Sequence, residues 1–288
     1  MLGRRGAGYA SPVIQIVCIK WGAKYGLDAV NRIHRAVRRG TSAPVRFVLI
    51  ADSVDEGLDP AIEVKQFPPF PVPFDLMTEG CRLKLAMFAP GLLDPDMPTV
   101  YFDLDTVVRG DVQRIADQLD RRPALYMLQN HYVQFWRYQS LLKLIGSDLF
   151  YYGNSSVLAF YPGRFGFIYE KFRELISTAP RATLPRQMKS DERFMSWAAQ
   201  GQVRVFPRSL AVKFAEEYMA PWTIVEDIRR HLPWVAKRRA NLVAITFVGP
   251  SVKPSELAKL KQGDIVRYRH FRYRWRPDAF RDYWDVPT

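Results

Sequence analysis

The sequence predicts an α/β fold in which a largely parallel sheet is flanked by helices. Apolar runs with the length of buried strands alternate with helical segments, and this alternation is typical of a parallel sheet. Two of these runs end in acidic residues, the first at Asp52 and the second at Asp103 and Asp105. Because ligands in open α/β sheets bind outside the carboxyl ends of the strands, the fold class also predicts where a site lies.

The first elements follow from the spacing of apolar residues. Val13–Ile19 and Val45–Asp52 are mostly apolar runs, which indicate buried strands. Between them, residues 23–40 repeat apolar side chains at helical spacing, and Gly40 is a typical stop signal for such a helix. The proline-rich segment 65–75 is expected to be a loop.

The later elements follow from the same reasoning. The remaining expected elements are a helix from residue 81 to the Pro-Gly pair at 90–91, strands at 99–105, 123–129 and 155–162, and short helices at 109–120 and 192–200. Asp191 precedes the last of these helices, so it is expected to be its N-cap in addition to any catalytic role. No internal repeat interrupts this order, which favours a single domain.

Composition and charge limit the possible partners. The 288 residues are 48% hydrophobic and 14% aromatic, which excludes a disordered or fibrous protein. A formal net charge of +13 favours polyanionic partners: nucleic acid, phosphorylated small molecules or an anionic membrane face. The two cysteines, Cys18 and Cys81, make no disulfide framework and indicate a reducing compartment. The four histidines lack the spacing of zinc ligands.

The N-terminal stretch bears on localisation. It carries two early arginines and an apolar run, but Gln15 and Lys20 interrupt or end that run and no cleavage pattern follows, which argues against a signal peptide. No segment has the apolar length that a membrane span needs. We therefore expect a cytoplasmic protein, with peripheral attachment to the inner face of the cell membrane left open.

The stretch PTVYFDLDTVVRGDV, residues 98–112, ends an apolar strand with two acids. Asp103 and Asp105 are close enough together to share one divalent cation, and carboxylate oxygens suit Mg²⁺ or Mn²⁺. Acids that cap the next helix are the structural alternative, and such a triplet often arises by chance. If the two carboxylates mainly repel each other, their amide variants should melt at an equal or higher temperature without ligand.

Several segments carry a resemblance to a known family. They are, in chain order, IKWGAKYGLDAVNRIHRAVRR from residue 19, FVLIAD from 47, CRLKLAMFAPGLLDPDMPTVYFDLDTVVRGDV from 81, YYGNSSVLAFYPG from 151, SDERFM from 190 and TFVGPSVKP from 246. In this order they resemble the GT-A glycosyltransferases of family 8 and related bacterial cell-surface sugar transferases. The resemblance runs from about Ile14 to Pro254. It implies a GT-A domain over residues 1–260, with a mostly parallel nucleotide-binding sheet, and a basic aromatic tail over 261–288.

The resemblance also implies roles for individual residues. Asp103 and Asp105 match the motif that holds a divalent metal, Mn²⁺ or Mg²⁺, on the diphosphate of a nucleotide sugar. By the same resemblance, the nucleotide is bound by Lys20, Trp21 and Asp52, and the donor phosphate and sugar are contacted by Arg82 and Lys84. The sugar pocket is lined by Asn154 and Ser155, and catalysis near the reacting carbon is assigned to Asp191 and Glu192. Lys253 is expected to bind the departing phosphate. Without the resemblance, Arg82 and Lys84 would read as a solvated helix face.

One departure from the family concerns the metal. Its members usually carry a histidine ligand just before the Lys-Pro pair, whereas this chain has Thr246 to Gly249 there, without histidine. Neither Thr246 nor Val248 replaces an imidazole. The departure predicts weak metal binding without nucleotide, rising sharply with UDP, or a greater dependence on Lys253 and arginines.

The implied activity is transfer of a hexose from a nucleotide diphosphate sugar, UDP-linked by preference, to a saccharide or lipid-linked acceptor, with retention of configuration. Two other classes remain open. A phosphatase of the haloacid dehalogenase type also uses a D-x-D-x-T motif, but on the first strand of its fold, and two strand–helix units precede Asp103 here. The net charge alone also fits a non-enzymatic nucleic-acid-binding protein.

The C-terminal stretch 265–285 alternates arginines with aromatic residues. This pattern fits stacking on single-stranded nucleic acid, and it also fits anionic lipid headgroups. A final strand and helix docked on the core would explain it equally well. If the tail binds lipid, a truncated protein that ends before Ile265 should bind anionic vesicles more weakly and still bind sugar nucleotides.

Overall fold

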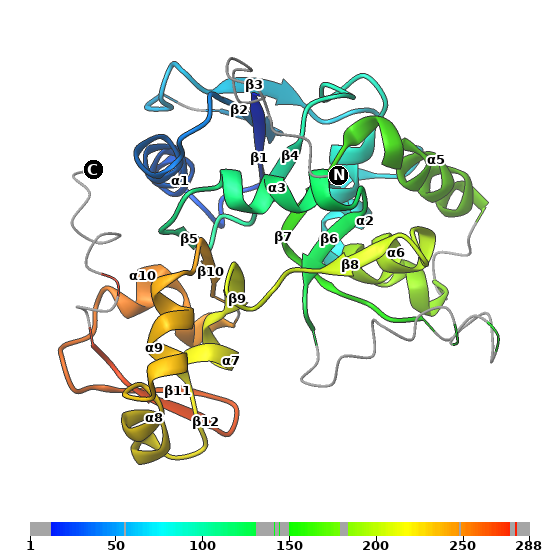
Figure 1. Ribbon diagram of the computed structural model, residues 1–288. Helices are drawn as coiled ribbons and strands as arrows, with labels where there is room; N and C mark the ends of the chain where they lie inside the picture. Colours follow the sequence, from blue (N-terminus) through cyan, green and yellow to red (C-terminus); the bar gives the residue numbers. More distant parts are fainter. Residues whose placement is uncertain are drawn as a thin grey trace, which may run out of the picture.

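The computed structural model describes residues 13–54, 56–130, 141, 144, 150–178, 184–247, 249–276 and 280. Within these residues, a large mixed sheet flanked by helices lies beside a smaller unit made of a second sheet, short helices and a hairpin (Figure 1). The two sheets are joined where the strand of the acidic motif leaves the large sheet. None of the described helices combines the length and the apolar character that crossing a bilayer requires.

The large sheet has seven strands in the order β3-β2-β1-β4-β7-β6-β8. Their bounds are β1 Ile14–Lys20, β2 Val45–Ala51, β3 Glu63–Gln66, β4 Thr99–Phe102, β6 Leu125–Leu128, β7 Asn154–Phe160 and β8 Val203–Val205. Strands β3, β2, β1 and β4 are mutually parallel, and β7 runs antiparallel between β4 and β6. The start of β7 therefore lies at the edge where β1 and β4 end, and the predicted mostly parallel sheet is confirmed.

Helices cover both faces of this sheet because its central strands are apolar on both sides. Along β1, Ile14, Ile16 and Cys18 pack into one core cluster, while Val17 and Ile19 pack into another. The first cluster lies under α1 (Leu27–Gly40) and α3 (Gln113–Arg121). The second lies under α2 (Phe74–Thr78), η1 (Glu79–Phe88), α5 (Pro162–Thr178), η3 (Arg186–Met188) and α6 (Asp191–Ala198).

The smaller unit is built on the sheet β5-β10-β9. Its elements are β5 Thr106–Val108, β9 Ala211–Lys213, α7 Phe214–Tyr218, α8 Thr223–Arg229, α9 Pro233–Ala240, β10 Ala244–Thr246, η4 Pro250–Val252, α10 Pro254–Leu257, β11 Ile265–Tyr268 and β12 Phe271–Arg274. A third core cluster fills this unit, in which the ring of Phe214 stacks on that of Phe247 with 4.8 Å between centroids.

The structure corrects four sequence expectations. The expected strand over 99–105 breaks after Phe102, and its continuation, β5, pairs with β10 instead. The edge strand β3 was missed because it is short and polar, and it overlaps the expected proline-rich loop. The expected helix after residue 81 is a 3-10 segment with a kink. The N-cap of α6 is Ser190, whose hydroxyl accepts a hydrogen bond from the Arg193 amide, so Asp191 is already in the first turn.

The C-terminal stretch is docked on the core where the structure describes it. Residues 265–274 form an antiparallel hairpin, and Tyr273, Trp275 and Phe280 are buried in the third core cluster. The arginines on the same stretch, such as Arg267, Arg272 and Arg274, are exposed. The stretch is therefore packed on the protein through its aromatic residues. The predicted domain boundary at residue 260 remains a prediction.

The kink in η1 depends on Gly80. Gly80 and Cys81 have positive φ values of 56° and 57°, and a Cβ at Gly80 would lie 2.1 Å from the carbonyl oxygen of Lys189. We expect Gly80→Ala to lower the unfolding free energy by about 2 kcal/mol, since both backbone and packing must shift. Gly22→Ala is the matched control, because Gly22 has the same φ with no atom near its Cβ position. It should cost only about 1 kcal/mol in urea unfolding. Equal losses would mean that the close approach to Lys189 is unimportant.

Candidate active site

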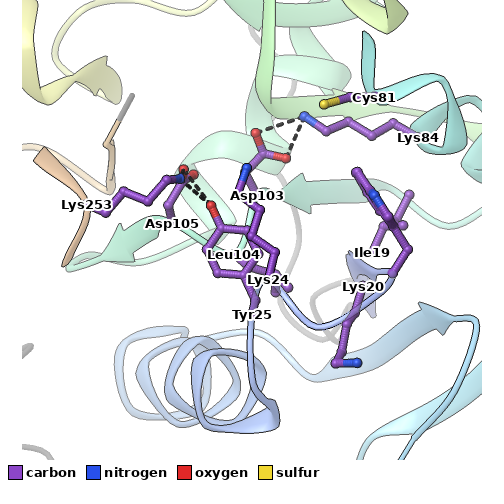
Figure 2. A pocket seen from close by; sticks show the side chains of 11 residues that line it. Ile19, Lys20, Lys24, Tyr25, Cys81, Lys84, Asp103, Leu104, Asp105 and Lys253 are labelled. Carbon is purple, nitrogen blue, oxygen red and sulfur yellow. Dashed lines mark hydrogen bonds and ion pairs between the residues drawn. The ribbon is translucent and has the colours of Figure 1, made fainter. Parts of the chain in front are cut away.

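A pocket of about 160 Å³ opens where β1 and β4 end. Its charged lining consists of Lys20, Lys24, Lys84, Lys253, Asp103 and Asp105 (Figure 2). The strands deliver these groups: Lys20 is the last residue of β1, and Asp103 follows the last residue of β4. Because lysines outnumber aspartates four to two, the pocket attracts anionic ligands.

Asp103 pairs with a buried lysine from η1. The Lys84 ammonium lies 2.6 and 2.9 Å from the two carboxylate oxygens of Asp103, and the Tyr101 hydroxyl donates a 2.5 Å hydrogen bond to the same carboxylate. Burial alone would lower the pKa of Lys84, but Asp103 and then Asp191 raise it well above its ordinary value. Lys84 therefore stays charged inside the protein.

Asp105 pairs with the second lysine of the pocket. Lys253 Nζ donates a 2.7 Å hydrogen bond to Asp105 Oδ2, which also accepts one from the Tyr25 hydroxyl at 3.1 Å. Lys253 and Tyr25 are themselves hydrogen-bonded. Burial and then the charge of Asp103 raise the pKa of Asp105, against the effect of Lys253. Burial and then Asp105 raise the pKa of Tyr25 to about 12.

The start of β7 meets the first turn of α6 beside this pocket. Ser155 Oγ donates a 2.5 Å hydrogen bond to Asp191 Oδ2, and Asn154 Nδ2 donates a 3.0 Å hydrogen bond to Glu192 Oε2. Lys84 connects the two groups of residues, since its Nζ is 3.7 Å from Asp191 Oδ2. These four predicted residues do lie together, one layer behind the pocket lining.

The titration of Asp191 gives a testable pH dependence. Burial raises its pKa from 3.8 to about 6, even though Lys84 and the Ser155 hydrogen bond act in the opposite direction. Because the folded protein holds this proton more tightly than the unfolded chain, the contribution of Asp191 to stability is full below its ordinary pKa and is lost as the pH rises through about 6.

The amide of Asp191→Asn cannot ionise, so the variant does not lose this contribution as the pH rises. The difference in unfolding free energy between the variant and the unmodified protein should therefore shift by about 2 to 3 kcal/mol in favour of the variant from about pH 4 to about pH 7. Urea unfolding of both proteins in metal-free buffer across this range measures the difference. Parallel pH profiles would show that Asp191 titrates normally.

Of three further residues predicted to contact the donor, only one lines the pocket. Trp21 lines it, whereas Asp52 and Arg82 do not. Asp52 accepts hydrogen bonds from the amides of Gly22 and Ser53 at 2.8 Å each, and so fixes the loop after β1. The buried Arg82 donates to the carbonyl oxygens of Met188 and Leu76, at 2.9 and 2.6 Å. Its predicted contact with the donor phosphate stays a prediction.

Sequence reasoning gave no role to several groups that belong to the site. Lys24 and Cys81 line the pocket, and Tyr101 bonds Asp103. Tyr25 was expected to be either a core residue or a nucleotide stacker, and its bonds to Asp105 and Lys253 were not foreseen. The alternation of strand side chains was the available signal for Tyr101, because it stands two residues before Asp103 and so faces the same side of β4. Nothing in the sequence marks Cys81, which lines the pocket from a backbone position with a positive φ.

Of the two aspartates, Asp105 is the one that keeps a carboxylate oxygen available to a divalent cation. Asp105 Oδ1 is buried and has no hydrogen-bond partner among the residues that the structure describes, whereas Oδ2 of the same carboxylate is paired. In the described part of the chain, no group of three or more His, Cys, Asp or Glu side chains could hold a metal. A cation here would therefore need water or phosphate oxygens to complete its shell. Thr246 is fully buried in β10 and is not part of the pocket lining, and Val248 lies outside the described residues.

Comparisons with solved structures identify the fold. No family model and no curated protein matches the sequence. The galactosyltransferase LgtC, solved with donor and acceptor sugar analogues, aligns with a TM-score of 0.52 and 14% identity over 83% of this chain and 88% of its own. The bifunctional glycosyltransferase WbbM aligns at 0.57 and 12% over 84% of this chain and 47% of its own.

The glycosyltransferase GlyE of Streptococcus pneumoniae aligns with a TM-score of 0.54 and 12% identity, over 95% of this chain and 61% of its own. All three share the GT-A architecture with this chain. The GT-A fold predicted from the sequence is therefore confirmed. The likeness extends over most of this chain.

Proposed function

We propose that this protein is a glycosyltransferase that moves a hexose from a UDP-linked donor to a hydroxyl of a saccharide or lipid-linked acceptor, with retention of configuration. The observation that carries the proposal is the pocket at the ends of β1 and β4, where two aspartates and four lysines converge in a GT-A fold. A pocket with excess positive charge and a pair of carboxylates suits a diphosphate together with a cation. LgtC, which has the same fold, was solved with donor and acceptor sugar analogues.

A bound cation and the Lys253 ammonium would both act on the leaving diphosphate. Bound Mn²⁺ or Mg²⁺ would be held by Asp105 through Oδ1 together with Asp103, and would supply a Lewis acid for the phosphates. Lys253 reaches the same carboxylate from the other side of the pocket, so its ammonium is placed to stabilise the charge that develops on the departing diphosphate. Lys20 and Lys24 add positive charge to the pocket lining.

The residues behind the pocket would position the sugar. Ser155 and Asn154 fix the carboxylates of Asp191 and Glu192 by hydrogen bonds. Asp191 is buried behind Lys84, which suits an orienting role better than an attack on the sugar. Trp21 and Tyr25 offer aromatic faces to the nucleotide base at the mouth of the pocket.

The phosphatase alternative has no specific support in the structure. That reading needs Asp103 at the end of the first strand, but three strands precede β4 in the chain. The Asp103 carboxylate, the nucleophile of such a mechanism, is held by Lys84 and Tyr101. The nucleic-acid alternative is weakened by the burial of Tyr273 and Trp275, which cannot stack on bases from inside the core.

The proposal is tested by incubating the protein with a panel of UDP-, GDP- and ADP-linked hexoses, with and without Mn²⁺, and measuring release of the nucleotide. We expect slow, metal-stimulated hydrolysis of one or two UDP-sugars, since water replaces the absent acceptor. Release of phosphate from simple phosphate esters without any cleavage of sugar nucleotides would favour the phosphatase instead.

A further inference from the structure

Large apolar side chains are exposed on α8, at its N-cap and at the start of α9 in the smaller unit. Trp222, Ile224, Ile228 and Trp234 are each 63 to 65% exposed, and Val225 is 41% exposed. These five residues, which we call the α8–α9 apolar face, lie within thirteen residues of sequence and come from α8 and the start of α9. Isolated exposed apolar residues are ordinary, but a cluster of this kind marks an interaction surface.

Helix α8 is oriented with its apolar side outward. Ile224 and Ile228 are one turn apart and face solvent, whereas Glu226 between them is only 2% exposed. The Glu226 carboxylate lies 2.9 Å from Arg229 Nε and 2.7 Å from Arg239 Nη1. A helix of a soluble domain normally buries its apolar side. The reversed orientation of α8 is therefore stabilised by buried ion pairs.

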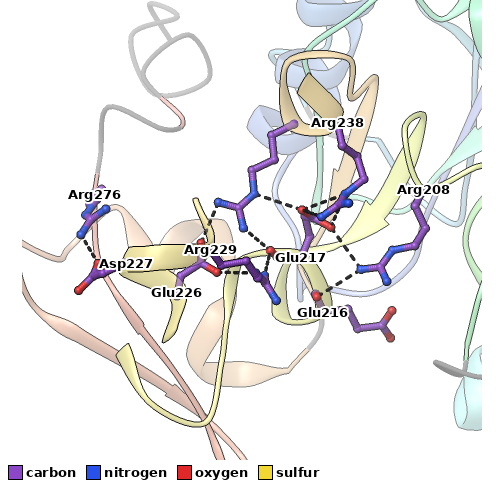
Figure 3. A network of polar contacts seen from close by, with 9 residues as sticks. Arg208, Glu216, Glu217, Glu226, Asp227, Arg229, Arg238 and Arg276 are labelled. Atoms are coloured by element: carbon purple, nitrogen blue, oxygen red, sulfur yellow. Dashed lines mark hydrogen bonds and ion pairs between the residues drawn. The ribbon is translucent and has the colours of Figure 1, made fainter. Parts of the chain in front are cut away.

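A buried polar network holds this orientation (Figure 3). Glu217 at the end of α7 is fully buried, and its carboxylate accepts hydrogen bonds from Arg238 at 2.8 Å and from Arg239 and Arg208 at 3.2 Å. Arg229 of α8 donates to the Glu217 carbonyl oxygen. These contacts tie α8 and α9 to α7, so the apolar face is built into the fold.

Positive charge surrounds the apolar face. A cavity of about 310 Å³ beside α8 is lined by Arg109, Arg230, Arg239 and Arg276, together with Glu226, which pairs with Arg239. Arg230 and His231 follow α8 directly and are exposed, as is Lys237 on α9. The hairpin that packs against α8 adds the exposed Arg272 and Arg274, of which Arg274 lies 3.6 Å from the Asp227 carboxylate of α8. Apolar side chains with tryptophans, surrounded by cations, match the interface of a bilayer that contains anionic lipids.

We propose that the α8–α9 apolar face docks the protein on the surface of a membrane that carries anionic lipids. Ile224, Ile228 and the two tryptophans enter the headgroup–acyl boundary, and the arginines contact lipid phosphates. A second copy of the chain fits this surface poorly, because a twofold contact would bring Arg230 and Lys237 of each copy toward the same residues of the other. The proposal does not depend on the reaction that the pocket catalyses. It assigns the apolar contact to α8 and α9, and the C-terminal hairpin adds cations beside them.

Vesicle sedimentation tests this assignment. The unmodified protein should bind vesicles of phosphatidylcholine with phosphatidylglycerol more strongly than vesicles of phosphatidylcholine alone. The double variant Ile224→Ser with Ile228→Ser should lower the partition coefficient at least about tenfold, since two apolar side chains lose their place in the interface. Arg230→Gln should lower binding about fivefold, and only to the anionic vesicles. The matched control, Val64→Ser with Phe74→Ser, alters exposed apolar residues on β3 and α2 and should bind normally.

A second measurement does not depend on these variants. Brominated lipids should quench the fluorescence of the unmodified protein, and Trp222→Phe and Trp234→Phe should each remove part of that quenching. Equal vesicle binding by the double isoleucine variant and the unmodified protein would overturn the proposal. So would a dimer in solution that the isoleucine variant dissociates, because the apolar face would then be covered by a second copy.

Discussion

Asp105→Asn is expected to slow sugar-nucleotide cleavage roughly a hundredfold or more, the scale of losing one major electrostatic stabiliser. The Asp105 carboxylate holds Lys253 at 2.7 Å and offers the unpartnered Oδ1 to a cation. An amide keeps the shape of the side chain but loses its charge, so both the cation and the lysine lose their anchor. Nucleotide release from a UDP-sugar in saturating Mn²⁺ measures the effect.

The stability of the variants separates function from folding. Lys253 is partly exposed, so Asp105→Asn should melt within a few degrees of the unmodified protein. Asp103→Asn should melt earlier, because it takes the main partner from the buried Lys84. From the sequence, both amide variants were expected to melt at the same temperature as the unmodified protein or higher. The ion pair between Asp103 and Lys84 reverses this expectation for Asp103→Asn. Asp111→Asn is the control, since Asp111 lies in the same stretch but outside the pocket lining. It should cleave the donor normally.

Glu217→Ala is expected to lower the unfolding free energy by about 3 to 5 kcal/mol. Glu217 is fully buried and compensates the guanidinium groups of Arg208, Arg238 and Arg239. Removing its carboxylate leaves these charges near one another without their common counter-charge. The loss is a large part of the 5 to 15 kcal/mol or so that stabilises a typical domain.

Urea unfolding measures this loss, with Glu256→Ala as the control. Glu256 forms a 2.8 Å ion pair with Lys259 in which both side chains are about half exposed or more. Such a surface pair contributes about 0 to 1 kcal/mol. If both variants lost the same small amount, the buried network would not be what holds α7, α8 and α9 together.

The large sheet could be predicted because its signals are local. The apolar runs of β1 and β2 and the helical spacing of α1 identify these elements without knowledge of the rest of the chain. The break between β4 and β5 could not be predicted, because nothing local separates residues 99–102 from the two acids that were expected to end one strand at residue 105. What decides it is distant in sequence: the Phe247 amide donates to the Asp105 carbonyl oxygen, and β10 takes β5 as its partner.

The site was only partly predictable for the same reason. Arg82 and Lys84 are two residues apart and were given one role, yet Lys84 reaches Asp103 while Arg82 binds backbone carbonyl oxygens elsewhere. Their directions are set by the kink at Gly80, which depends on its close approach to Lys189.

Helix α8 shows most clearly what the sequence could not predict. Its sequence is amphipathic, but which side is buried depends on Arg239 of another helix.

The central claim is that the pocket at the ends of β1 and β4 binds UDP together with a divalent metal through Asp105. Calorimetric titration of UDP into the unmodified protein and into Asp105→Asn, each with and without Mn²⁺, tests it most directly. We predict weak binding of Mn²⁺ alone, UDP binding that tightens strongly when Mn²⁺ is present, and loss of that tightening in Asp105→Asn. UDP binding that is the same with and without Mn²⁺, or unchanged by Asp105→Asn, would contradict the claim.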